Sequence, residues 1–249
     1  MTETQTETKY GMRKAEQREQ LPDIDLLPLI PHNGKKLDVA IFGPNTYRTN
    51  LDLMGKVYFH SRQLPNISFK PATTSESISA AASGFGSNGE VDAKRDILDP
   101  GWLQTGDIVR TQDGVFTNTT VIDETSLKQF LDGAEKVNGI YLLNGGIGFA
   151  PYESFEIGAQ DCITFAHGGL ARALEHTPEK VATKLGKIAS PKFYKGEINV
   201  ICFDPVEKPI SRVASLYSNS NIDGNRLHVD GYYRYDVDGY AFGVFEKTS

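Results

Sequence analysis

Apolar residues in the first third of the chain fall into short runs bounded by turn residues, a pattern typical of β-strands. Residues 37–42 are predicted to form a buried strand that ends at the Gly-Pro-Asn turn of residues 43–45. Two further strands are predicted at 56–62 and 67–70, separated by the Leu-Pro-Asn turn at 64–66. The N-terminal part of the domain is therefore expected to be β-structure.

Helical spacing replaces these runs in the middle of the chain. Residues 126–137 carry apolar side chains every three or four positions, open with a capping box and end before an Asn-Gly pair. A short apolar run at 140–143 predicts a buried strand. Two more helices are predicted, at about 161–175 and from the Thr-Pro pair at 177–178 to just before Pro191.

Two segments of different composition lie between the N-terminal strands and this helical region. Residues 72–100 are rich in Ser, Ala, Gly and Asp and are predicted to be a long loop that includes a short helix at 75–82. An Asp-Gly pair at 113–114 predicts a tight hairpin between strands at 108–111 and 115–121.

From residue 197 onward strand character returns. Four strands joined by turns predict an antiparallel meander: residues 198–203, 210–217, 226–235 and 240–245. The predicted fold class is therefore α+β, with N-terminal strands, three consecutive central helices around a buried strand, and a C-terminal antiparallel β-meander.

The domain organisation follows from length and polarity. Residues 1–20 are polar and charged and are predicted to be a flexible tail, while residues 21–249 are predicted to form a single α+β domain. Residues 21–31 alternate apolar positions with prolines, which favours an extended segment on a surface. That segment packs on its own domain or binds a partner, and the pattern leaves both open.

Composition and charge narrow the function classes. Hydrophobic residues make up 39% and charged residues 23% of the 249 residues, and no apolar run approaches the ~18 residues of a membrane span. The N-terminus lacks the features of a secretory signal, so we expect a soluble, cytoplasmic protein with no membrane partner. A net charge of −6 without a basic run argues against nucleic acid as a partner.

Glycines after the predicted central strand are the first candidate ligand site. Asn144, Gly145, Gly146 and Gly148 follow the apolar run directly, and glycines allow backbone N–H groups to approach an anion. Known phosphate loops run straight into a helix, whereas Pro151 and about ten irregular residues intervene here. A tight turn that leaves a sheet is the alternative interpretation.

His167 is the second candidate, because it lies near Cys162 and a nucleophilic thiol needs a base. The two residues are about 140° apart around a continuous helix, so a hydrogen bond between them would require the helix to break at the two glycines that follow His167. We therefore expect Cys162 to be structural and keep His167 as a ligand-binding candidate.

No metal site is predicted. Cys162 and Cys202 are far apart and form no CxxC motif. His228 and Asp230 share one strand face, but two ligands are too few. A calcium loop starting at Asp236 would lack the oxygen ligand required at its twelfth position.

Residues 101–107, Gly-Trp-Leu-Gln-Thr-Gly-Asp, resemble the GWxxTGD motif of the adenylate-forming acyl-CoA ligases. The resemblance covers seven residues and implies an Asp that holds the ribose of a nucleotide. Those enzymes are much longer, and the phosphate loop that should precede the motif is missing, since residues 72–76 lack its glycines and lysine. No functional residue is therefore assigned from that family.

Two functions remain as hypotheses. The first is binding or transformation of a small anionic molecule near the glycines and His167, under the 72–100 segment, with cofactor and reaction unknown. The second is a non-catalytic interaction or assembly protein, including one that assembles with copies of itself. Its contact surface would be the aromatic residues of the meander: Tyr232, Tyr233, Tyr235, Tyr240 and Phe242.

Overall fold

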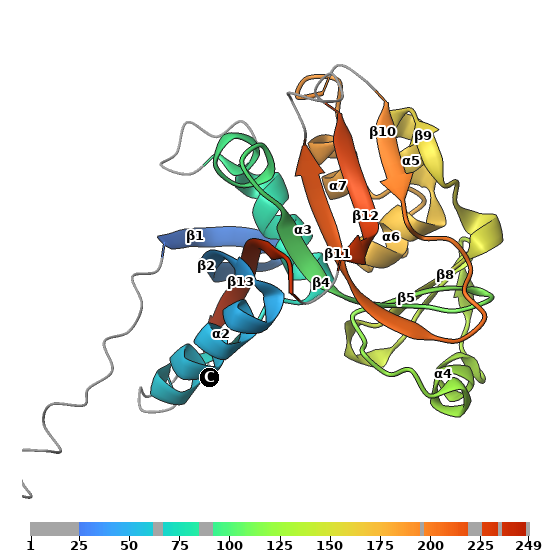
Figure 1. Cartoon of the computed structure of the whole chain (residues 1–249), viewed down its shortest axis with the longest axis horizontal. Helices are drawn as coiled ribbons and strands as arrows, with labels where there is room; N and C mark the ends of the chain where they lie inside the picture. The colour runs from blue at the N-terminus through green and yellow to red at the C-terminus, as the bar shows by residue number, and fades with distance from the viewer. Residues whose placement is uncertain are drawn as a thin grey trace, which may run out of the picture.

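The computed structural model describes residues 25–61, 67–84, 92–194, 197–218, 226–233 and 236–247, so the predicted tail at 1–20 lies outside the described residues. The first of its two sheets contains β1 (Asp25–His32), β2 (Lys35–Thr46), β3 (Ile67–Pro71) and β13 (Asp238–Lys247). Their order is β1-β2-β13-β3, and all neighbours are antiparallel. Figure 1 shows this sheet beside the second, larger one.

The second sheet has the strand order β6-β7-β8-β5-β4-β11-β12-β10-β9. Its neighbours are antiparallel except for β10 and β12, which run parallel. The pairing of Tyr240 with Leu103 joins the two sheets. Its strands are β4 (Leu103–Arg110), β5 (Gly114–Thr117), β6 (Lys136–Val137), β7 (Ile140–Leu142), β8 (Gly148–Pro151), β9 (Gly158–Gln160), β10 (Ile198–Ile201), β11 (Ile210–Ser218) and β12 (Leu227–Tyr233).

Helices cover both sheets. Within the described residues they are α2 (Tyr47–Ser61), α3 (Thr74–Gly84), α4 (Glu124–Leu131), α5 (Cys162–His167), α6 (Gly169–Glu175) and α7 (Thr183–Ile188), with a π-helical turn at Lys94–Leu98 and 3-10 turns at Asn144–Gly146 and Tyr152–Ser154. No helix in this part of the chain is both long enough and apolar enough to cross a membrane.

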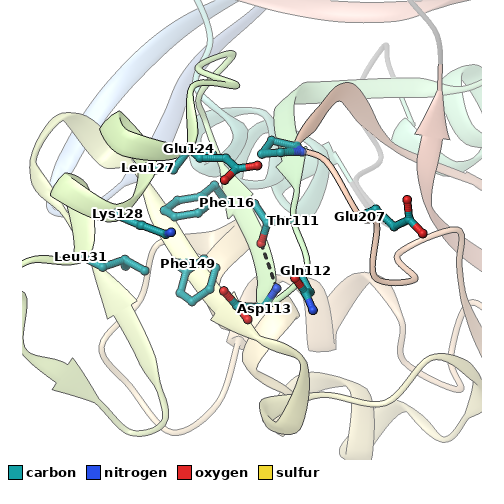
Figure 2. A pocket seen from close by; sticks show the side chains of 11 residues that line it. Thr111, Gln112, Asp113, Phe116, Glu124, Leu127, Lys128, Leu131, Phe149 and Glu207 are labelled. Carbon is teal, nitrogen blue, oxygen red and sulfur yellow. Dashed lines mark hydrogen bonds between the residues drawn. The ribbon is translucent and has the colours of Figure 1, made fainter.

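Two of these helices pack on separate small cores. Helix α2 contacts β2, β3 and β13 and buries Tyr47, Met54 and Val57 against the first sheet. Helix α4 contributes Leu127 to a cluster with Phe116 of β5 and Phe149 of β8, as Figure 2 shows. Each helix thus uses one apolar stripe to cover part of a sheet.

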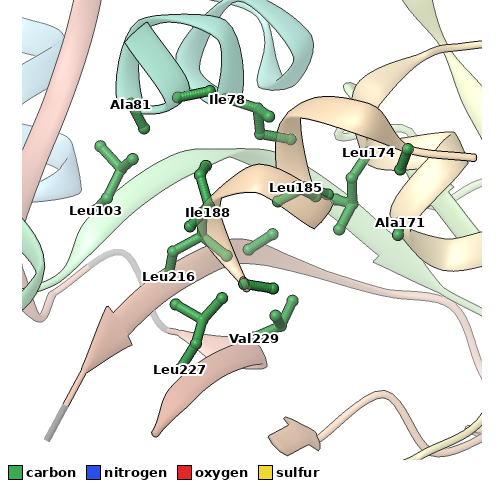
Figure 3. Close-up of a cluster of buried hydrophobic side chains, with 14 of the residues drawn as sticks. Ile78, Ala81, Leu103, Ala171, Leu174, Leu185, Ile188, Leu216, Leu227 and Val229 are labelled. Carbon is green, nitrogen blue, oxygen red and sulfur yellow. The ribbon is translucent and has the colours of Figure 1, made fainter. Parts of the chain in front are cut away.

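The main core lies where α3, α6 and α7 pack over the second sheet. Ile78 of α3 and Leu185 of α7 lie in it together with Leu216 of β11 (Figure 3). Helix α3 is almost wholly buried although its sequence is mostly Ser and Ala. Small side chains allow the neighbouring helices to approach its backbone closely, so α3 forms the centre of the helical layer.

The predicted strand at 56–62 is wrong, because those residues belong to α2 as far as Ser61. Tyr47, Leu51 and Met54 follow helical spacing, and the short aromatic run after them looks like a strand only when read alone. The strands predicted at 37–42 and 67–70 are confirmed, and β2 continues past the predicted stop to Thr46.

The arrangement of three consecutive helices is also wrong. Helix α4 ends at Leu131, and four short strands, β6 to β9, lie between it and α5. The helix predicted at 161–175 is divided at Gly168, whose backbone is extended, into α5 and α6. The third helix, α7, starts at Thr183 instead of 177.

The C-terminal strands exist, but they do not form a meander. Only β11 and β12 are antiparallel neighbours, since β10 pairs with β12 in parallel and β13 inserts between β2 and β3 in the first sheet. Local turn signals predict that a chain reverses but do not specify the strand beside which it returns. The hairpin of β4 and β5 is confirmed.

The structure is thus a mixed α/β fold with a large, mostly antiparallel sheet and several helices. Of the predicted loop at 72–100, the structure places α3 and the π-helical turn, while residues 85–91 lie outside the described part. Helix α3 also lines the candidate site.

Candidate functional site

A hollow of about 580 Å³ lies between the β1–β2 turn, α3 and α7. This volume falls in the range of small-molecule sites. Its charged and polar walls include His32, Lys35 and Lys36 from the strand ends that flank the turn, Ser79 from α3, and Lys184 and Lys187 from α7. The site is therefore assembled from three segments that are far apart in the sequence.

The β1–β2 turn places one wall of the hollow. Asn33 and Gly34 have φ values of 46° and 77°, as a two-residue hairpin turn with positive φ at both positions requires. His32 pairs with Lys35 across this turn. The His32 ring, Lys35 and Lys36 thus lie together at the end of the hairpin.

Helix α7 places the opposite wall. Lys184 and Lys187 are three positions apart and therefore lie on neighbouring parts of the helix surface. Leu185 and Ile188 of the same helix are buried in the main core and anchor it. The Lys187 Nζ donates a hydrogen bond to the Ala82 carbonyl near the end of α3, at 2.5 Å.

Hydrogen bonds hold the His32 ring in a defined state. The Ser79 hydroxyl donates to the Ser75 carbonyl at 2.8 Å, so it is available to accept from His32 Nδ1, also at 2.8 Å. Asn33 Nδ2 lies 3.2 Å from His32 Nε2 and donates to it. These bonds fit a neutral ring with its proton on Nδ1. Burial, and next the charge of Lys184, lower the pKa of His32, which favours the same neutral form.

The electrostatics of the hollow are positive. No residue among those lining it is acidic. The nearby Glu76 is paired with Lys70 at 3.1 Å. Burial lowers the pKa of the Lys184 ammonium, an effect that Glu175 opposes. In a chain of net charge −6, the walls thus concentrate cationic groups on one small surface.

Sequence reasoning missed this site. The sequence has no basic run, and the Lys-Lys pair at 35–36 and the lysines at 184 and 187 come together only in the folded chain. The one usable signal was that the predicted 72–100 segment could line a ligand site, since Ser79 of α3 does line this hollow.

The predicted glycine site lies elsewhere, in the connection from β7 to β8. Gly145 and Gly146 have φ values of 74° and 78°, and the Leu143 N–H donates to the Ile147 carbonyl at 2.8 Å to close the turn. Asn144 is exposed at its start. Asn118 Nδ2 also donates to the Gly145 carbonyl at 3.1 Å. Anion binding by this turn stays a prediction.

Gly148 and His167 occupy different elements from that turn. Gly148 lies buried in β8, where an added Cβ would come within 2.8 Å of the Ala173 carbonyl of α6. His167 is exposed at the end of α5, and its carbonyl accepts from Arg172 Nε at 3.1 Å. The ligand-binding role of His167 also stays a prediction.

The aromatic residues of the proposed interaction surface are divided between surface and core. Phe242 is buried and Tyr240 packs partly against the same core, whereas Tyr232 is 47% exposed. The side chains of Tyr233 and Tyr235 lie outside the described residues. Phe242 therefore cannot contribute to a contact surface unless the core opens.

Among the described residues, no group of three or more His, Cys, Asp or Glu side chains could hold a metal ion. His228 and Asp230 are both buried on β12. The His228 ring stacks on Tyr217, with 4.6 Å between the ring centroids.

Comparison with known proteins gives little further information. No protein-family model matches the chain, and no curated protein matches it. One solved structure is similar, described as "Accommodation of massive sequence variation in Nanoarchaeota by the C-type lectin fold", with 14% identity and a TM-score of 0.45 over 86% of this chain and 99% of that chain. A likeness at this TM-score carries no argument about the ligand of this chain.

Proposed function

We propose that this protein binds a small anionic molecule in the hollow between the β1–β2 turn, α3 and α7. The observation that carries the proposal is the convergence of four lysines, beside His32, on a hollow without a lining carboxylate. Lysine ammonium groups donate hydrogen bonds to phosphate and carboxylate oxygens, and such charge-assisted bonds are stronger than neutral ones.

The number of cationic groups favours a ligand with at least two negative charges. Four ammonium groups around one hollow repel one another, and an anion placed between them relieves that repulsion. Lys35, Lys36 and Lys187 are exposed, so salt should screen their attraction for the ligand strongly. Binding should therefore be strongest at low ionic strength.

Thermal melting at low ionic strength tests the proposal, with pyrophosphate and citrate as probes and glucose as a neutral control. Both anions should raise the Tm, because a ligand that binds only the folded state stabilises it. Lys184→Ala and a Lys35→Ala/Lys36→Ala variant should each reduce the affinity for pyrophosphate by about tenfold. Sodium chloride at about 0.2 M should reduce it further.

The matched control is Lys56→Ala, which removes an exposed lysine of α2 that does not line the hollow. Its affinity for pyrophosphate should equal that of the wild type. If all variants bind pyrophosphate equally, the anion is bound elsewhere. If no anion raises the Tm of the wild type, the proposed function is wrong.

A further inference from the structure

A second cavity lies between α4, the turn from β4 to β5 and the connection from β10 to β11, and it shares no lining residue with the lysine hollow. Phe116, Phe149 and Leu127 form its apolar wall, as Figure 2 shows. The two phenylalanine rings lie 4.4 Å apart between centroids and are tilted by 40°. One side of the cavity is thus built from aromatic rings that are themselves packed in a buried cluster.

Charged side chains surround this apolar wall. Glu124 and Lys128 come from α4, Asp113 from the β4–β5 turn and Glu207 from the β10–β11 connection. All four are exposed. Three carboxylates against one ammonium make the rim negative, which is the reverse of the lysine hollow.

Two of the three walls of the cavity, the β4–β5 turn and the β10–β11 connection, are tied together through Thr111. Its hydroxyl accepts from the Asp113 and Gly114 N–H groups at 3.2 and 3.1 Å and so shapes the β4–β5 turn. Its carbonyl accepts from the Val206 N–H at 3.1 Å, one residue before Glu207. On the opposite wall, the Asp123 carboxylate caps α4 by accepting from the Ser126 N–H at 2.8 Å. The rim carboxylates are therefore carried by backbone that is held in place.

The volume of the cavity limits its occupant. It measures about 120 Å³, somewhat less than a cavity of about 150 Å³ that binds benzene. One small ring therefore fills it when the polar group of the ligand lies at the mouth. Aromatic faces attract cations, and the rim carboxylates add to that attraction.

We infer that this cavity binds a small monocyclic amine in its protonated form, with the ring against Phe116 and Phe149 and the ammonium group among Asp113, Glu124 and Glu207. A neutral ring compound of the same shape would keep the apolar contacts and lose the charge contacts. A carboxylate in place of the ammonium would be repelled by the rim. The charge of the ligand is therefore the property that the cavity selects.

Ligand-observed NMR with benzylamine, benzyl alcohol and benzoate tests the inference on the whole protein. Benzylamine should bind about tenfold more tightly than benzyl alcohol, and benzoate more weakly than either. Glu124→Gln/Glu207→Gln should bring benzylamine to the affinity of benzyl alcohol. Lys128→Ala should increase the affinity for benzylamine, because it removes the positive charge from the rim.

Glu179→Gln is the control, since Glu179 is exposed and does not line the cavity. It should leave benzylamine binding unchanged, and an unchanged Tm should show that each variant is folded. Equal binding of the three compounds, or wild-type affinity for benzylamine in the Glu124→Gln/Glu207→Gln variant, would overturn the inference. Absence of benzylamine binding at millimolar concentration would overturn it as well.

Discussion

The buried carboxylate of Glu175 at the end of α6 accepts a hydrogen bond from the backbone N–H of Leu185 in α7, at 2.5 Å. The Glu175 carbonyl accepts a second bond, from the hydroxyl of Ser75 in α3, at 2.6 Å. One residue therefore joins the three helices of the main core, directly beside Lys184 of the lysine hollow. The protonation of Glu175 should then affect both the stability of the fold and the charge of the site.

The first prediction concerns stability and pH. Burial raises the pKa of Glu175 from 4.5 to about 7, so the folded state holds this proton more tightly than the unfolded state does. The stability that this group contributes is complete below about pH 4.5, falls as the pH rises, and is lost above about pH 7. The loss is at most roughly 3 kcal/mol. Urea denaturation between pH 4.5 and 8 measures it.

Glu175→Gln supplies the comparison for this first prediction. The glutamine oxygen can still accept from Leu185 N–H, but the side chain does not titrate. The variant should lose the fall in stability between pH 4.5 and 7, while Glu179→Gln keeps it. A wild-type pH profile in Glu175→Gln would show that another group causes the fall.

The second prediction concerns sulfate, whose charge is constant near neutral pH. Sulfate should bind the lysine hollow more tightly at pH 6 than at pH 8, because Glu175 loses its negative charge beside Lys184 as the pH falls through about 7. Calorimetric titration should show a difference of a few fold, in line with a partly screened interaction between neighbouring charges. In Glu175→Gln the two affinities should become similar. A larger affinity at pH 8 in the wild type would contradict this coupling.

The third prediction concerns two glycines, Gly146 in the β7–β8 turn and Gly148 in β8. Gly148→Ala should destabilise the fold by about 1–3 kcal/mol, because the new methyl would overlap the Ala173 carbonyl. Gly146→Ala should cost about 1 kcal/mol, since its φ is 78°. Neither change should alter pyrophosphate affinity after correction for folding. Loss of affinity in Gly146→Ala alone would instead place the anion at the β7–β8 turn.

The fourth prediction concerns Cys202. Burial, and next the Asp230 carboxylate, raise the pKa of its thiol. In a Cys162→Ser background, a thiol reagent should therefore modify Cys202 more slowly at pH 8 than it modifies a small-molecule thiol. Asp230→Asn should accelerate the reaction by removing the neighbouring charge. A rate equal to that of the free thiol in the wild-type site would contradict the prediction.

Local signals predicted much of the secondary structure. The β4–β5 hairpin and the apolar run of β3 depend on neighbouring residues, and both elements were found as predicted, although Gly114 lies in β5 without a positive φ. The short helix predicted at 75–82 was found as α3, but its burial was not predicted, because its Ser and Ala residues do not form an amphipathic pattern and the helix is packed on all sides. The partners of β13 could not be predicted, since they depend on contacts with residues almost the full chain length away.

The candidate site was hidden for the same reason. Each lysine pair by itself is typical of an exposed surface, and only the packing of α7 and the β1–β2 turn on either side of α3 brings them together. The prediction of an anionic ligand was reached from the glycines of the β7–β8 turn, whereas the lysine hollow supports it on independent grounds.

The pairing of β2 with β13 constrains how the chain can fold during synthesis. Residues 47–237 must be translated before β13 can pair with β2, which takes roughly 10–40 s at ordinary elongation rates. During that interval one edge of β2 has no strand beside it, and an open edge is a template for pairing with other chains. A nascent chain of this protein should therefore be prone to pairing with other chains until β13 has been made.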